Sequence, residues 1–458
     1  MNAMAERFSA RPLPHEKSFC HIGLPERFFS DDAATGRSPS ETSAIGLDPT
    51  FSPIGAARAF ARANEDDILA TLFALRGIRD AAIVIHGAAG CRAAATALDE
   101  PGFARWYSVN LGERDFILDS EKPLREAISR AIREGARVVF VLGTPVLSID
   151  GDVGAPTAQG LGGDEAPVPV LYLNAGASRP GGSPLSGFDP AFRALLRLVE
   201  TPGERGGFVN VVSVRENARN LAAVRDVLGG LGIEWNVLPC FSTLAAIRGA
   251  GRADATISLN ADEGEYLGLG LESAFGVPYA RLPAPVGLAA TGRFVRALGA
   301  LFGLGEKAEA YVEAREGALR EVTAARPLAG KRLFLQLDMA LVEGFSGLVR
   351  DLGGEVAGIA LSNVDLNNRV HLERLEAVAD IPATVAVGQS FDASILARAP
   401  VDYYVGREQV AFAARHGAIP ISLRDSAWYG YEGMRAFAAA LLKQPHPASR
   451  QGADSLKT

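Results

Sequence analysis

The stretch with the clearest chemical potential joins an apolar run to a glycine-bracketed cysteine. Residues 81–85 read Ala-Ala-Ile-Val-Ile, and they are followed by His86, Gly87, Gly90 and Cys91. A strand that ends this way places a thiol at the carboxyl edge of a sheet, where open α/β folds bind ligands. Gly87 and Gly90 have no Cβ, so the backbone there can turn tightly and approach a bulky group. Cys91 is therefore a candidate iron ligand, and the alternative is a buried cysteine that packs as a small apolar residue.

The composition indicates a large folded protein and argues against some classes of partner. The chain has 458 residues, of which 48% are hydrophobic, enough for two or three domains with buried cores. A net charge of -7 without a basic stripe argues against nucleic acid as a partner. No apolar run has membrane-spanning length, and residues 1–30 lack the core of a signal peptide. We therefore expect a soluble cytoplasmic protein that does not bind a membrane.

The three cysteines, Cys20, Cys91 and Cys240, do not form a recognisable framework. They are odd in number and far apart in the sequence, unlike the cysteines of a disulfide-linked domain. Three thiols also cannot make a self-contained four-thiolate metal site. Cys240 follows an apolar run in the second half of the chain, and we expect it to pack in a core.

Apolar runs alternate with helical patterns through most of the chain. This alternation is typical of parallel sheets that are buried on both faces. We predict an α/β fold with three Rossmann-like, doubly wound parallel-sheet domains. The domains are expected at residues 51–205, 206–325 and 326–443, with an extended N-terminal arm at 1–50 and a disordered tail at 444–458. No strand is followed by a glycine fingerprint for a dinucleotide or a P-loop, so we assign no nucleotide site to this chain.

Four segments, in the same order, resemble motifs of the nitrogenase component 1 family, which includes nitrogenase-like reductases. The resemblance covers about residues 50 to 440. Its motifs are His86 to Cys91, Leu118 to Ile128, Leu142 to Asp152, and Trp428 to Gly433. Each motif is weak by itself, and their common order on a repeated βα pattern is what carries the resemblance. In the second motif, Asp119 or Ser120 can cap the helix that follows.

The sequence departs from the family pattern at the positions of its cluster ligands. Family members commonly use three cysteines per subunit to hold an iron–sulfur cluster at a subunit interface, and here only Cys91 keeps its place. The third position is Gly143, and the first falls near Asp66 or Asp67, or near Phe51. The segments that would carry the ligands of a large catalytic cofactor have no cysteine around residues 258–260 and no histidine around 419–429. A chain of this kind is similar to the family's β-type subunits.

The resemblance implies a β-type subunit of a nitrogenase-like reductase, paired with an α-type subunit as an α2β2 heterotetramer. A separate ATP-dependent iron–sulfur reductase would supply electrons to a shared cluster, for which a 4Fe-4S cluster is expected. Cys91, Gly87 and Gly90 would form this chain's part of the cluster site. Two alternatives stay open. One is a scaffold subunit on which a nitrogenase-type cofactor matures. The protein would then serve nitrogen fixation. The other is a cluster-free binding or assembly module.

Several further residues have both a functional and a purely structural interpretation. Cys20 in the arm is an auxiliary ligand if the arm folds back to the cluster, and otherwise an exposed thiol. Asp66 or Asp67 can supply an oxygen ligand, or can simply stabilise the start of a helix. His86 can relay protons or form a hydrogen bond within the core. Asp150 and Asp152 can cap a helix or shape the surface where an electron donor docks, and we expect capping. For the aromatic group of Trp428, Tyr429 and Tyr431 we expect packing or subunit contact rather than substrate stacking.

Overall fold

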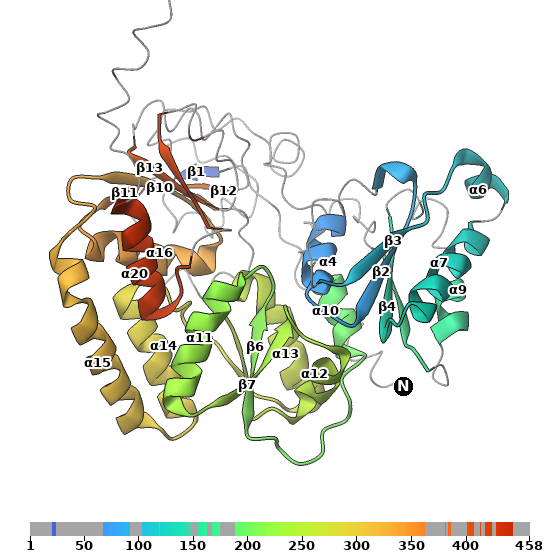
Figure 1. The fold of residues 1–458 in the computed structure, drawn as a ribbon, viewed down its shortest axis with the longest axis horizontal. Helices are drawn as coiled ribbons and strands as arrows, with labels where there is room; N and C mark the ends of the chain where they lie inside the picture. Colours follow the sequence, from blue (N-terminus) through green and yellow to red (C-terminus); the bar gives the residue numbers. More distant parts are fainter. Residues whose placement is uncertain are drawn as a thin grey trace, which may run out of the picture. The chain divides into compact units, whose positions relative to one another are not determined.

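The computed structural model has three β-sheets with helices packed around them (Figure 1). It describes residues 21–23, 67–91, 103–118, 120–144, 147, 154–162, 167–174, 188–361, 381, 383–385, 401–406, 413, 417–423 and 427–442. The first two sheets are wholly parallel, and in the third a single antiparallel edge strand joins five parallel strands. The predicted fold, α/β with three Rossmann-like parallel sheets, is confirmed.

The first sheet has the strand order β3-β2-β4-β5. These strands are Arg105–Ser108, Ala81–His86, Val138–Gly143 and Val170–Asn174. Helices α4 (Asp67–Arg76) and α10 (Phe188–Leu196) contribute to the core on one face of the sheet. Helices α7 (Glu121–Arg133) and α9 (Gly154–Gly162) contribute to the core on the other face (Figure 1). Residues 81–85 of β2 and 138–142 of β4 are all apolar, as expected for central strands with both faces covered.

The second sheet has the order β7-β6-β8-β9. Its strands are Glu234–Pro239, Phe208–Ser213, Ala255–Ser258 and Tyr279–Ala280. Helices α12 (Leu244–Arg248) and α13 (Ala261–Phe275) belong to this part of the chain. Leu267 and Leu271 of α13 share an apolar core with α4 and α10. The first two sheets therefore belong to one compact unit, whose described residues lie within 65–215 and 234–281.

The third sheet lies in a second compact unit, formed by 16–64, 216–233 and 282–458. Its order is β1-β12-β11-β10-β13-β14, with β1 antiparallel. The strands are His21–Gly23, Ala383–Val385, Glu355–Leu361, Arg332–Leu337, Tyr403–Gly406 and Ile419–Ser422. Strand β1 comes from within the predicted N-terminal arm. The domain boundaries taken from the sequence stay predictions.

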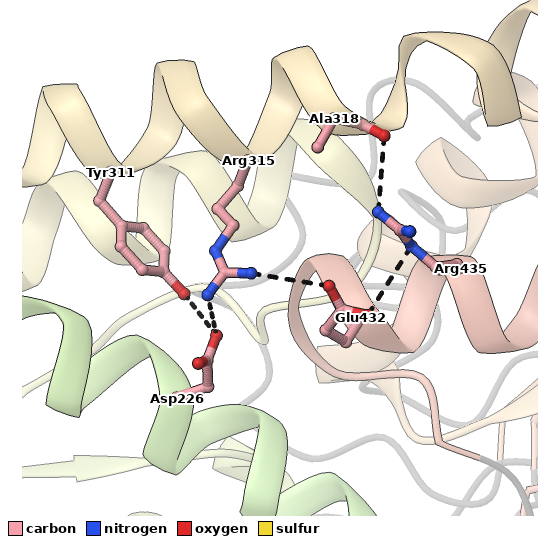
Figure 2. A network of polar contacts seen from close by, with 6 residues as sticks. All are labelled: Asp226, Tyr311, Arg315, Ala318, Glu432 and Arg435. Carbon is pink, nitrogen blue, oxygen red and sulfur yellow. Dashed lines mark hydrogen bonds and ion pairs between the residues drawn. The ribbon is translucent and has the colours of Figure 1, made fainter.

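Five helices of the described residues belong to the second unit. They are α11 (Ala218–Leu231), α14 (Gly287–Leu301), α15 (Gly305–Ala324), α16 (Met339–Asp351) and α20 (Gly430–Leu442). Asp226 of α11 accepts hydrogen bonds from Tyr311 and Arg315 of α15, at 2.9 and 2.7 Å (Figure 2). Arg315 also pairs with Glu432 of α20. These partly exposed contacts orient three helices that are far apart in the sequence.

The aromatic group around the start of α20 packs inside this unit. Trp428, Tyr429 and Tyr431 are at most 3% exposed, so the predicted packing role is confirmed. The side-chain oxygen of Asn220 accepts hydrogen bonds from the backbone N–H groups of Trp428 and Tyr429. The Tyr429 hydroxyl donates to buried Glu216 at 2.9 Å. Buried polar groups of this kind need partners, and here the partners attach the last helix to the start of α11.

Candidate functional site

The candidate site lies where strand β2 ends. All six residues of β2 are buried, and its last residue, His86, pairs in register with Gly143, the last residue of β4. The chain then forms a short 3-10 helix, Ala89–Cys91, in which the Cys91 N–H donates to the Ala88 carbonyl at 3.0 Å. Because neighbouring parallel strands end together, this turn lies at the carboxyl edge of the first sheet, as the sequence predicts.

Cys91 occupies the boundary between core and surface. Its side chain is half-buried and packs against the apolar core shared by α4 and α10. Gly90, directly before it, is exposed, and a Cβ added there would meet no atom of the described residues within 4 Å. The thiol is thus fixed on one side by packing and has open space beside its backbone. Partial exposure of this kind is one property of cysteines that are reactive, whereas fully buried cysteines are inert.

Gly87 has a different role from Gly90. A Cβ at position 87 would lie 2.2 Å from the Thr144 hydroxyl, so only glycine fits beside this side chain. The Gly87 carbonyl accepts a hydrogen bond from the Leu111 N–H at 2.9 Å, and the Thr144 N–H donates to the His86 carbonyl at 3.1 Å. The close neighbour of Gly87 is therefore a strand end of this chain itself. Gly87 fixes the turn, and Gly90 keeps it open.

His86 is fully buried, with one ring nitrogen paired. Nε2 lies 3.3 Å from the Ser120 carbonyl oxygen, which can only accept, so Nε2 carries the hydrogen. Burial lowers the pKa of His86 from its ordinary 6.5, against the opposing effects of the Ser120 hydrogen bond and the Glu121 carboxylate. Within the described chain, Nδ1 has no hydrogen-bond partner. The predicted core hydrogen bond is confirmed, and the proton relay stays untested.

The sequence missed the residues that surround this histidine. Ser120 stands at the N-cap of α7 as expected, but its side chain makes no capping bond, and its carbonyl holds His86 instead. Gly154, the first residue of α9, lies against the imidazole and against the ring of Tyr172. Tyr172 is the aromatic residue of an otherwise aliphatic strand end, Val170 to Leu173. That contrast is the signal in the sequence that could have drawn attention to it.

The other candidate ligands are not brought to Cys91 by the described part of the chain. Cys20, Asp66, Asp150 and Asp152 lie outside the described residues, as does the side chain of Asp67, which begins α4. Cys240 is 4% exposed, which confirms its predicted packing role. No group of three or more His, Cys, Asp and Glu side chains that could hold a metal occurs among the residues described. Among the described residues, Cys91 is therefore the one candidate thiol at this edge of the sheet.

None of the helices that can be described combines the length and the apolar character that a bilayer crossing needs.

Comparison with known proteins identifies the family of this fold. Residues 68–444 match the sequence profile of the nitrogenase component 1 type oxidoreductases. The chain belongs to this family. The resemblance noted in its motifs is thereby confirmed, and the matched region contains all four of them.

Component 1 relatives are similar to this chain to different extents. One chain of the light-independent protochlorophyllide reductase of Heliobacterium modesticaldum is 32% identical over 145 residues. That alignment covers 30% of this chain and only 27% of the relative. The structure described as "Nitrogenase Cp1 at pH 5" shares 15% identity at a TM-score of 0.74, and the match covers 95% of this chain and 98% of that structure. A second structure, "Nitrogenase Cp1 at pH 6.5", shares 17% identity at a TM-score of 0.70, and the match covers 84% of this chain and 91% of that structure. These structures establish the component 1 fold.

Proposed function

We propose that this chain is a β-type component 1 subunit that lends one thiolate, from Cys91, to an iron–sulfur cluster shared with an α-type subunit. The observation that carries the proposal is the position of Cys91, half-buried at the carboxyl edge of the first sheet and next to the open turn at Gly90. Membership of the component 1 family supports it. A complex of the α2β2 type would then place the remaining ligands on the partner.

The donor set fits this restricted role and does not fit a cluster held by this chain alone. A 4Fe-4S cluster takes four protein ligands, usually thiolates. Among the residues that the structure describes, Cys91 is available, while position 143 is a glycine and Cys240 is closed inside a core. A single thiolate suits a subunit that completes a cluster mostly held by another chain.

Bound at this edge, a cluster would supply one-electron transfer between an ATP-dependent iron–sulfur reductase and a substrate in the partner. The residues of this chain position the thiol and exclude water. Thr144 packs against Gly87 and fixes the turn, while the buried His86 supports the strand end through Ser120. Their burial keeps the inner side of the site dry, and a dry surrounding tunes the reduction potential of a metal centre. The similarity to one chain of a protochlorophyllide reductase supports a reductase over a maturation scaffold.

A cluster-free binding or assembly module is the second candidate. It is favoured by one observation, the lack of a second described thiol at the edge that carries Cys91. Under this alternative Cys91 is a packing residue of the core it contacts.

The deciding experiment measures iron, acid-labile sulfide and the EPR signal after reduction in complexes purified anaerobically with the α-type partner. We expect Cys91→Ala to lose or alter the reducible cluster while the two chains still co-purify. Cys240→Ala is the matched control, because it removes a thiol of the same unit that faces the core. An iron-free wild-type complex, or a cluster unchanged by Cys91→Ala, would favour the cluster-free module.

A further inference from the structure

The turn after β7 has a backbone conformation that is unusual for an aromatic residue. Phe241 has a φ of 59°, which lies in the left-handed region. A residue with a Cβ adopts this region at a steric cost, and a bulky aromatic residue is rarely found there. Such a conformation persists only where the surrounding structure enforces it. The contacts of this turn therefore identify what holds it in place.

An aromatic stack of four side chains joins Phe241 to helix α4. The guanidinium carbon of Arg76, the last residue of α4, lies 4.6 Å from the ring centroid of Phe73 and 4.8 Å from that of Phe103. The Phe103 ring in turn stacks on Phe241, with the centroids 5.7 Å apart and the planes at 29°. A cation over an aromatic face is attracted by the ring quadrupole, and here two rings attract the same cation. The stack thus links a helix of the first sheet to a turn of the second.

Hydrogen bonds hold the same turn against the segment before β2. The Arg79 N–H donates to the Ser242 carbonyl at 3.0 Å, and the Arg79 guanidinium donates to the Phe241 carbonyl at 2.5 Å. Gly77 and Cys240, whose backbones are in contact here, are buried. The four side chains of the aromatic stack are each partly exposed. The stack is therefore the part of this contact that lies nearest to water.

We propose that the aromatic stack is a latch. While it is assembled it holds residues 240–243 in their strained, closed conformation, and when it separates this turn opens locally and both sheets stay folded. The turn follows β7 at the carboxyl edge of the second sheet, the edge where open α/β folds bind ligands. The closed latch covers the β7 end of that edge, and the open latch exposes it. The latch does not depend on a bound cluster.

Labelling of the Cys240 thiol measures how often the latch opens, because this residue is 4% exposed in the closed form. In the full chain with Cys20→Ser, we expect Phe103→Ala to raise the labelling rate at least about tenfold. The faster rate should depend little on denaturant at low concentrations, since a local opening exposes little surface. Phe208→Ala is the matched control, because Phe208 is a partly exposed ring that packs on the same core outside the stack. It should leave the rate at low denaturant within about twofold of the parent chain.

Two substitutions at position 241 test whether the closed turn is strained. Phe241→Ala and Phe241→Gly both remove the ring from the stack, so both should speed the labelling of Cys240. Glycine adopts a positive φ without the steric cost that alanine meets. The glycine variant should therefore remain closed for more of the time, and label at least about threefold more slowly than the alanine variant.

Unchanged labelling in Phe103→Ala would overturn the latch. So would an increase that appears only at denaturant concentrations that unfold the chain, since the sheets would then have to unfold first. Labelling of Phe241→Gly as fast as that of Phe241→Ala would overturn the strain that the latch opposes. If Phe103→Ala does not fold, Arg76→Leu tests the same layer, because it removes the cation and keeps an apolar side chain. We expect it to speed labelling at least about threefold, and an unchanged rate would again overturn the latch.

Discussion

Two cysteines follow strand ends in the same compact unit, and their surroundings are opposite. Cys91 follows β2 and is half-buried beside an open glycine. Cys240 follows β7, is 4% exposed, and donates its backbone N–H to the Ser213 carbonyl. Both come after an apolar run, and both lie at the carboxyl end of a parallel strand. Position at a sheet edge therefore does not by itself make a thiol available.

The segment that precedes β2 accounts for the difference. A Cβ on Gly77 would lie 2.6 Å from Cα of Cys240, so the two backbones are in direct contact. The Arg79 side chain donates to the Phe241 carbonyl at 2.5 Å, and a carboxylate oxygen of Asp80 accepts from the Leu244 N–H at 2.8 Å. These contacts cover the turn that carries Cys240. Within the residues described, no comparable segment closes over Gly90.

The largest expected effect on the difference between the two cysteines comes from adding one methyl group at Gly77, next to Cys240. Gly77→Ala should lower the free energy of unfolding by about 3 kcal/mol, because the methyl would meet backbone atoms that cannot move aside. Chemical denaturation followed by circular dichroism measures the change. A cost below about 0.5 kcal/mol, the range of neutral surface substitutions, would show that the two backbones are not in close contact.

The accessibility of the two thiols gives the next largest effect. In a Cys20→Ser background without a partner, we expect Cys91 to react with a thiol reagent on the order of 100-fold faster than Cys240, which is reached only by local opening. Mass spectrometry of peptides after timed labelling measures both rates. Adding Gly77→Ala should narrow the ratio by speeding the labelling of Cys240. Equal rates in the parent chain would contradict the comparison.

The buried histidine near Cys91 predicts a dependence of stability on pH. The folded-state pKa of His86 is below the 6.5 of an unfolded chain, so the unfolded state binds more protons between the two values. Stability should therefore be full above about pH 6.5 and fall as the pH drops through this window. Denaturation of wild type and His86→Gln at pH 7.5 and pH 5 measures the difference. An equal loss in both proteins would remove His86 as its cause.

The smallest expected effect, with the opposite sign, is at Gly90. Gly90→Ala should leave the free energy of unfolding unchanged or raise it by up to about 0.5 kcal/mol, since the methyl meets no neighbour in the described part of the chain and the unfolded chain loses freedom. The same denaturation assay used for Gly77→Ala provides a direct contrast. Destabilisation of more than about 1 kcal/mol, the scale of a native clash, would mean that the turn at Cys91 is closed as well.

Much of the architecture follows from local patterns in the sequence. Continuous apolar runs such as Val138 to Leu142 predicted buried parallel strands, and the structure has them. Helix ends were less certain, because capping depends on side-chain geometry. Asn217 and Asn260 accept backbone hydrogen bonds at the starts of α11 and α13, whereas Ser120 stands at a helix start without capping it.

The sequence by itself determined the α/β class, the parallel sheets, the family and the strand-end position of Cys91. These follow from periodicity and short motifs, which act over a few neighbouring residues. Only the tertiary structure decided which cysteine is open, why Gly87 and Gly143 must be glycines, and where the Tyr172 phenol lies. Those properties depend on close approach between segments such as 77–80 and 240–244, or β4 and β5, and steric exclusion across such distances has no local signal in the chain.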